Sequence, residues 1–205
     1  MYNKDRFYKL FSIYVLKRQK GELMKEELID VLDENGIKTG QVLTRKEVHK
    51  KGLWHRIIVV AIINEKNEIL IQQRSDNKDK NPGMWDISVT GHLSAGQDSL
   101  SAATREISEE VSVSLGYSVD VKDFRFMFSY RKEEKVNDDH YDRQFYDFFI
   151  LRQSGLNEKN IKFQSSEVQA IKFINISKLN EMREKNLLVN RDECYESLSE
   201  YLFRI

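Results

Sequence analysis

The chain of 205 residues contains a single cysteine, Cys194, and a single proline, Pro82. One thiol cannot form an internal disulfide or a cysteine-rich zinc site, so nothing demands an oxidising compartment. The 33 basic and 33 acidic side chains cancel, which removes a global field for nucleic acid or an anionic membrane. The longest uninterrupted apolar run, Ile57 to Ile63, is much shorter than the roughly 20 residues of a spanning helix. We therefore expect a cytoplasmic protein with no transmembrane segment and no nucleic acid partner.

The length and the 40% hydrophobic content fit one globular domain rather than a disordered chain. Residues 1–23 are predicted to be an N-terminal extension, which is either helical or the product of a start assigned too far upstream of Met24. A Lys-Gly-Glu stretch just before Met24 resembles a translated ribosome-binding sequence and supports the second interpretation. Residues 24–205 are predicted to form the domain itself.

Strand-like and helix-like segments alternate along this domain. Apolar, β-branched runs predict a short strand over 29–32 and a hairpin made of 56–64 and 69–73. Further strands are predicted over 124–131, 145–152 and 168–174, followed by helices over 176–185 and 191–203. This order predicts an α/β (α+β) fold in which a mixed sheet lies between helices.

Three of the nine glycines, Gly83, Gly91 and Gly96, lie close together and next to the only proline. Glycine and proline mark places where the backbone makes unusual turns. Irregular loops beside buried strands often carry functional residues. We therefore expect a site in this segment.

A helix is predicted over 99–113, capped by Asp98 or Ser99. At 100° per residue one face forms an apolar stripe for the core, made of Leu100, Ala103, Thr104, Ile107 and Val111. Glu106, Glu109 and Glu110 share an arc beside this stripe, where like charges repel. One interpretation is a solvated acidic face with Arg105 paired to Glu109. The other is a site for Mg²⁺ or Mn²⁺, which favour oxygen ligands.

The segment that starts at Gly91 resembles the Nudix box. Gly91 is followed at the family's spacing by Gln97 and then by the run Arg105-Glu106-Ile107-Ser108-Glu109-Glu110. Two positions depart from the pattern. Gln97 replaces the first glutamate of the box, which in the family helps orient the arginine or the metal. Ser112 replaces the closing glycine, so the helix is expected to continue towards Gly116.

Residues 26 to 180 also resemble bacterial Nudix proteins that are similar to isopentenyl-diphosphate isomerase, with motifs such as Trp54-His55-Arg56, Trp85-Asp86 and Gly91-His92. The isomerases bind a metal through three histidines, and the resemblance places His49, His55 and His92 at matching positions. His49 and His55 are alternatively polar surface or core groups, whereas His92 is expected to touch the site. The isomerases need a cysteine where this chain has Thr90, and glutamates where it has Asp142 and Gln144.

The resemblance implies a Nudix-type α/β/α sandwich and a magnesium-dependent hydrolase of phosphoanhydride bonds. The substrate would be a nucleoside diphosphate linked to another moiety, or a similar small organic diphosphate. Isopentenyl-diphosphate isomerase and a non-catalytic module that binds a nucleotide or a partner remain alternatives. The oligomeric state stays open, a homodimer included.

The resemblance also assigns roles to individual residues. Glu106, Glu109 and Glu110 would hold the metal, with Glu106, Glu109 and Arg105 as the catalytic set. Arg74, Lys78, Gly91 and His92 would bind the diphosphate. The base that activates water would be a glutamate of the box or one of Glu133, Glu134 and Glu167.

Overall fold

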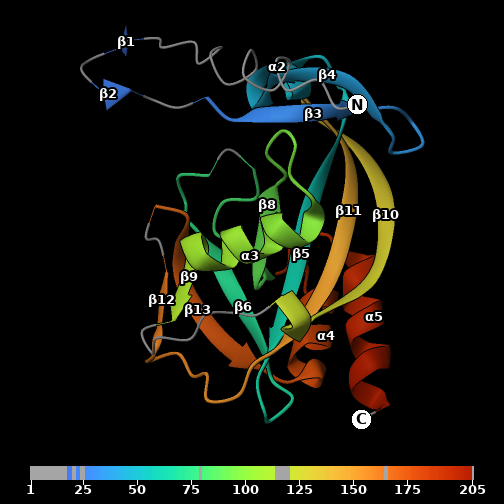
Figure 1. The fold of residues 1–205 in the computed structure, drawn as a ribbon. Coiled ribbons are helices and arrows are strands. Elements are labelled where there is room, and N and C mark those ends of the chain that lie inside the picture. The colour runs from blue at the N-terminus through green and yellow to red at the C-terminus, as the bar shows by residue number, and fades with distance from the viewer. Residues whose placement is uncertain are drawn as a thin grey trace.

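The computed structural model describes residues 18–19, 22–23, 26–78, 80–113, 121–163 and 166–204 (Figure 1). The extension predicted over 1–23 lies outside these residues except for a short antiparallel pair, β1 (Arg18–Gln19) with β2 (Glu22–Leu23). None of the described helices is both long enough and apolar enough to cross a membrane.

A mixed sheet forms the centre of the molecule. Its strands are β3 (Leu28–Leu32), β4 (Lys38–Thr44), β5 (Trp54–Ile63), β6 (Ile69–Arg74), β7 (Trp85–Ile87), β8 (Val89–His92), β10 (Phe124–Asn137), β11 (His140–Arg152) and β13 (Val168–Ile174). β5 runs parallel to β11 and antiparallel to β8, and β10 pairs with the other edge of β11. β6 pairs with β5, β7 and β13. A small second sheet joins β9 (Val111–Val113) to β12 (Ile161–Phe163).

The helices lie on both faces of the sheet (Figure 1). They are α2 (Arg45–Lys50), α3 (Ser99–Glu110), α4 (Ile176–Glu184) and α5 (Asp192–Phe203), together with the 3₁₀ turn η1 (Val121–Asp123).

The central strand β5 explains this layering. Side chains alternate across a strand, so Ile58 and Val60 belong to the cluster that includes Ala103 and Ile107 of α3. The intervening residues belong to the cluster that includes Leu179 of α4 and Leu198 of α5. A strand covered on both faces must be apolar throughout, which is the origin of the run at Ile57 to Ile63. The α/β/α sandwich with a mixed sheet is therefore confirmed.

Helix α3 begins where the sequence predicts and ends earlier. The Asp98 carboxylate accepts a hydrogen bond from the Ser101 backbone N–H at 2.9 Å, as an N-cap residue does. The predicted continuation to residue 113 and beyond is wrong, because the helix stops at Glu110 and Val111 opens β9 opposite Phe163 of β12. Val111 therefore lies outside the helical stripe. Val111 and Val113, on either side of Ser112, are β-branched. Such residues favour the strand conformation when a neighbouring strand, here β12, can pair with them.

The charged residues 132–142, which separate the predicted strands over 124–131 and 145–152, lie mostly in strands as well. β10 continues to Asn137 and β11 starts at His140. Edge strands tolerate charged residues, which discourage pairing with other chains. Charge therefore does not mark the end of β10.

Ile107 tests the packing of α3. Its side chain is 2% exposed and lies in the cluster with Ile58 and Val60 of β5. Truncation of a buried isoleucine leaves a cavity, so Ile107→Ala is expected to lower the free energy of unfolding by about 2–5 kcal/mol. Denaturant unfolding measures this change. Ser108→Ala, one position further along at the exposed surface, is the control and should change the free energy by less than about 1 kcal/mol.

Candidate active site

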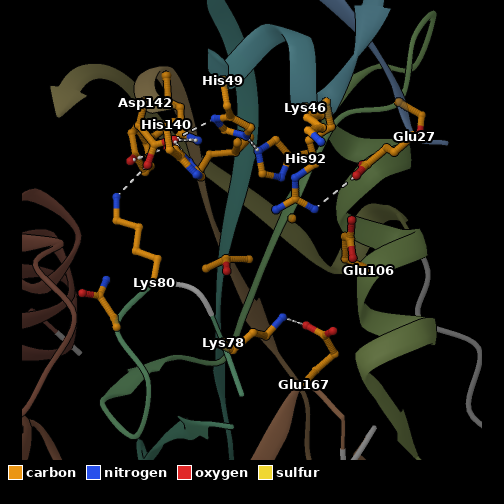
Figure 2. A pocket seen from close by; sticks show the side chains of 18 of the residues that line it. Glu27, Lys46, His49, Lys78, Lys80, His92, Glu106, His140, Asp142 and Glu167 are labelled. Atoms are coloured by element: carbon orange, nitrogen blue, oxygen red, sulfur yellow. Dashed lines mark hydrogen bonds and ion pairs between the residues drawn. The ribbon is translucent and has the colours of Figure 1, made fainter. Parts of the chain in front are cut away.

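A cavity of about 1900 Å³ opens over one end of the central strands. Figure 2 shows Glu27 and Glu106 on one side of it, and Asp142, His140 and His49 on the opposite side. Lys80 lies directly below Asp142, and Lys78 lies lower in the view, between the two groups and next to Glu167 (Figure 2). The cavity thus joins segments from both halves of the chain.

Glu106 lines the cavity on the side formed by α3. Its side chain points from the helix onto Gly91 of β8, and the residue is only 8% exposed. A Cβ atom at residue 91 would lie 2.1 Å from the Glu106 Cδ, inside any tolerable contact distance. Only glycine at this position lets the carboxylate lie against the strand.

Arg105 links the carboxylates of α3. Its Nη2 lies 2.8 Å from Glu106 Oε1, and its Nη1 donates to Glu109 Oε2 at 2.9 Å. Nη2 also donates to the backbone carbonyl of His92 at 2.9 Å. Gln97 Oε1 lies 3.5 Å from the same Nη2, so a neutral amide stands where the family has a carboxylate. The guanidinium is therefore held by both the strand and the helix, and it fixes the directions of both glutamates.

Burial is the main cause that raises the pKa of Glu106, to about 7. The Arg105 guanidinium opposes this shift, whereas the negative charge of Glu109 adds to it. A carboxylate that is costly to ionise beside another carboxylate is stabilised in its charged form by a cation. Glu106 and Glu109 both line the cavity and offer the oxygen ligands that Mg²⁺ requires. The side chain of Glu110 lies outside the described residues.

Gly91→Ala provides a direct test of this arrangement. The added methyl group must push the Glu106 carboxylate away from β8, since the Cβ and the carboxylate cannot occupy the same space. We expect Mg²⁺ affinity, measured by calorimetry, to fall by about 10-fold or more. The control is Ser108→Ala on the exposed face of α3, which leaves Gly91 and the contact between Gly91 and Glu106 unchanged. Equal Mg²⁺ affinity in the Gly91→Ala and wild-type proteins would show that Glu106 does not hold the ion.

The structure brings the three predicted histidines together. Ligand nitrogens of His49, His55 and His92 all lie within 4.8 Å of one another. His49 Nε2 and His92 Nε2 are 3.2 Å apart, and the rings of His55 and His92 are stacked. Burial lowers the pKa of His55 to about 4 and lowers that of His92 well below its usual range. These imidazoles are neutral near pH 7 and keep a lone pair each.

Three further residues complete this wall of the cavity. Asp142 lies 2.9 Å from His49 Nδ1 and 2.8 Å from His140 Nε2 through the same oxygen, Oδ1. His140 is not among the predicted site residues, although its spacing of two residues from Asp142 places both on one face of a strand. Lys80, also not among them, donates to Asp142 Oδ2 at 2.6 Å and to Glu134 at 2.8 Å. No signal in the sequence marks Lys80 apart from other loop lysines.

Arg74 and Lys78, the two basic residues among the predicted diphosphate ligands, both line the cavity and have other contacts. Arg74 donates through Nε and Nη2 to the carbonyl of Lys80, at 3.1 and 3.0 Å, and thereby shapes the loop after β6. Lys78 forms an ion pair with Glu167. An incoming diphosphate would compete with these contacts.

The glutamates outside α3 that are predicted as general bases also form ion pairs. Glu167 pairs with Lys78, Glu134 with Lys80, and Glu133 with Arg143 at 3.0 Å. Glu27 lies on the same side of the cavity as Glu106, and its charge contributes to the raised pKa of Glu106. It pairs with Arg45 at 3.2 Å. Glu27 is not among the predicted site residues, because it precedes β3 and is far from the box along the chain.

Comparisons with known proteins agree with this geometry. The family model described as NUDIX domain matches residues 53–197. Nudix hydrolase 3 of Arabidopsis thaliana is 36% identical over 175 residues, which is 84% of this chain and only 22% of the plant protein. An uncharacterised Nudix hydrolase of Listeria monocytogenes is 34% identical over 154 residues, 75% of this chain and 83% of that protein.

The chain is also similar to an isomerase and to a solved structure. Isopentenyl-diphosphate Delta-isomerase 1 of Photorhabdus laumondii is 29% identical over 161 residues, 78% of this chain and 86% of that protein. A crystal structure of a Deinococcus radiodurans protein superimposes with a TM-score of 0.62 and 18% identity, covering 87% of this chain and 98% of that one. That likeness supports the fold alone.

The fold and the box define a protein of the Nudix class. The family model and the Listeria relative both span most of the domain, so the chain belongs to the Nudix hydrolase family.

Proposed function

We propose that this protein is a Mg²⁺-dependent hydrolase of phosphoanhydride bonds, acting on a nucleoside diphosphate linked to another moiety or on a similar organic diphosphate. The main support is the pair Glu106 and Glu109, which Arg105 joins on one wall of a cavity that also contains Arg74, Lys78 and Lys80. Carboxylates that hold a cation therefore share a cavity with side chains that bind phosphate oxygens. We place the activity in the cytoplasm, because no feature of the sequence requires an oxidising compartment.

Each side chain has a distinct role in this proposal. Glu106 and Glu109 hold the ion, and Arg105 keeps both carboxylates in place. Arg74 offers a planar donor fork to phosphate oxygens, and Lys78 offers a point charge once either exchanges its present partner for substrate. A Mg²⁺ ion held by these carboxylates would neutralise diphosphate oxygens and lower the pKa of a bound water molecule. Glu109, the more exposed of the two glutamates, accepts the proton of the attacking water.

The isomerase alternative rests on the relatives of that name and on the histidine cluster. Thr90 and Gln144, which lie where the isomerases have a cysteine and a glutamate, argue against this alternative. Thr90 has no thiol that can ionise near pH 7, and Gln144 has no carboxylate. Gln144 is moreover fixed in place, since it accepts a hydrogen bond from Tyr146 at 2.7 Å and contacts His55 Nε2 at 3.1 Å. We therefore favour hydrolysis.

A phosphate-release screen tests the proposal. The purified chain is incubated with Mg²⁺ and with nucleotide sugars, dinucleotides, nucleoside triphosphates or isoprenoid diphosphates, and the products are resolved by chromatography. We expect cleavage of at least one class, and loss of that cleavage when EDTA removes the metal. Proton exchange at the allylic carbon of isopentenyl diphosphate would instead identify an isomerase. Calorimetric binding of a nucleotide without any turnover would identify a non-catalytic module.

A further inference from the structure

The cavity lies where the central sheet divides into two parts. Among the described residues, β5 and β6 pair only through Ile63 and Ile69, beside the turn that joins them. Further along, β8 pairs with β5, whereas β7 and β13 pair with β6. Ser88, between β7 and β8, holds the two parts together, because its hydroxyl group accepts from the Ile62 N–H at 2.8 Å and donates to the Leu70 carbonyl oxygen. Residues of both parts line the cavity beyond this point.

Gln72 lies at the inner end of this opening, on the face of β6 that also carries Leu70 and Arg74. Gln72 and Arg74 both line the cavity, and Gln72 is the more deeply buried, at 5% exposure. A strand rises about 3.3 Å per residue, so Gln72 lies about 7 Å further along β6 towards the interior of the sheet. An organic group attached to a diphosphate at Arg74 can therefore reach Gln72.

The side-chain amide of Gln72 has an unmet requirement. Its Oε1 is buried and has no hydrogen-bond partner among the described residues. Gln144, a second buried amide of the cavity, differs in this respect, since it accepts from the Tyr146 hydroxyl at 2.7 Å and contacts His55 at 3.1 Å. Buried polar atoms in folded proteins almost always have a partner. A ligand that enters the cavity can supply the partner that Gln72 lacks.

A hydroxyl group is the ligand chemistry that fits this amide. A hydroxyl both donates and accepts, so it satisfies the amide of Gln72 through the oxygen or, if the amide is turned, through the nitrogen. Thr90 of β8 lines the same cavity and offers a further hydroxyl group. A hydrocarbon tail would instead cover the amide without a partner, and a buried polar group in that state is costly.

We propose that Gln72 is a specificity-determining residue, which binds a hydroxyl group of a sugar attached to the diphosphate. This inference rests on the proposed function, since it takes the diphosphate to lie at Arg74 and the glutamates of α3. It narrows the substrate class to sugar-bearing diphosphates and excludes isoprenoid diphosphates. A site built to hydrogen-bond a substrate hydroxyl strongly rejects an analogue that lacks it, because the polar group of the site is then left unpaired.

The test is a calorimetric comparison of the full-length chain with Gln72→Met, in millimolar Mg²⁺. The sugar-bearing probe is the methylene analogue of ADP-ribose, which carries a ribose on each side of a bridge that resists hydrolysis. We expect the wild type to bind it at least about 100-fold more tightly than isopentenyl diphosphate. Gln72→Met should bind it at least about 10-fold more weakly than the wild type. The same variant should bind isopentenyl diphosphate more tightly, since methionine offers an apolar surface of similar length.

Two controls separate the sugar from the phosphates and from general effects. Methylenediphosphonate has no sugar, so the wild type and Gln72→Met should bind it equally. Gln41→Met makes the same chemical change on the exposed part of β4 and should leave all three affinities unchanged. Thermal melts report whether each variant is folded, and Gln72→Leu serves as a second variant at the same position.

Three outcomes would overturn the proposal. The first is a wild type that does not bind the ADP-ribose analogue, and the second is wild-type affinity for that analogue in folded Gln72→Met and Gln72→Leu. The third is an equal loss for methylenediphosphonate, which would assign Gln72 to the phosphates. Because these probes report binding without turnover, their failure leaves the hydrolase proposal standing. Conversely, a chain that shows the expected binding but no turnover in the phosphate-release screen would contradict only the hydrolase proposal.

Discussion

Replacement of Glu109 by glutamine is expected to lower turnover of the hydrolysed substrate by about 10²–10⁴-fold, the usual contribution of a general base. The substitution keeps the size of the side chain and removes the charge that accepts the proton and attracts the cation. The fold should be unaffected, because the Glu109 side chain is 54% exposed and its Arg105 partner keeps Glu106 as a second carboxylate. The measurement is the rate at saturating substrate and Mg²⁺, with the thermal unfolding temperature recorded in parallel.

Glu200→Gln is the matched control for this experiment. It makes the same chemical change on α5, where Glu200 is 74% exposed and pairs only weakly with Arg204 at 3.7 Å. Its rate should equal that of the wild type. A Glu109→Gln protein that turns over at the wild-type rate would remove Glu109 from the mechanism and transfer the role of base to Glu27 or another carboxylate of the cavity.

The sequence predicts the parts of this molecule that depend on local chemistry. The apolar run of β5 and the periodicity of α3 identify the layers, because burial on two faces or on one stripe imposes those patterns. The spacing from Gly91 to Glu106 identifies the glutamate side of the cavity. The structure adds the reason for that spacing, since Gly91 lies directly beneath the Glu106 carboxylate.

The opposite wall depends on contacts between distant segments, and the sequence predicts it only in part. The resemblance predicts His49 and His92, whereas His140 and Lys80 reach Asp142 from β11 and from the loop after β6. Nothing local to Lys80 distinguishes it from other lysines before the chain folds. The end of α3 shows the same limit, because Val111 leaves the helix to pair with a strand some 50 residues further on.

Replacement of Arg191 by methionine is expected to cost about 3–5 kcal/mol of folding free energy. Arg191 forms a bidentate pair with Asp86, Nε to Oδ1 at 2.7 Å and Nη2 to Oδ2 at 3.0 Å. Asp86 is fully buried in β7, and Arg191 precedes α5 with only 7% exposure. Removal of the arginine leaves a buried carboxylate without its main partner, which is why the loss exceeds that of a surface pair. Denaturant unfolding measures it.

Two further variants test whether the unpaired charge of Asp86 causes the loss of stability in Arg191→Met. Arg183→Met breaks the ion pairs of Arg183 with Asp192 and Glu196, which are 48% and 64% exposed, and should cost less than about 1 kcal/mol. The double variant Asp86→Asn with Arg191→Met leaves no charge to desolvate, so it should be more stable than Arg191→Met alone. A double variant that is less stable would show that packing of the Arg191 side chain, rather than the unpaired charge, fastens α5 to the sheet.

The Arg191→Met substitution is also expected to change substrate binding, through its effect on Arg74. Arg74 Nη1 already lies 3.6 Å from Asp86 Oδ2, so loss of Arg191 leaves Arg74 as the nearest described guanidinium for that carboxylate. A turn of Arg74 towards Asp86 would withdraw it from the Lys80 carbonyl and from the cavity. We therefore expect Arg191→Met to raise KM more than it lowers kcat, because Arg74 is a proposed ligand of the diphosphate and the glutamates of α3 remain in place. An unchanged KM in a folded Arg191→Met protein would contradict the expected link between the Arg191–Asp86 pair and Arg74.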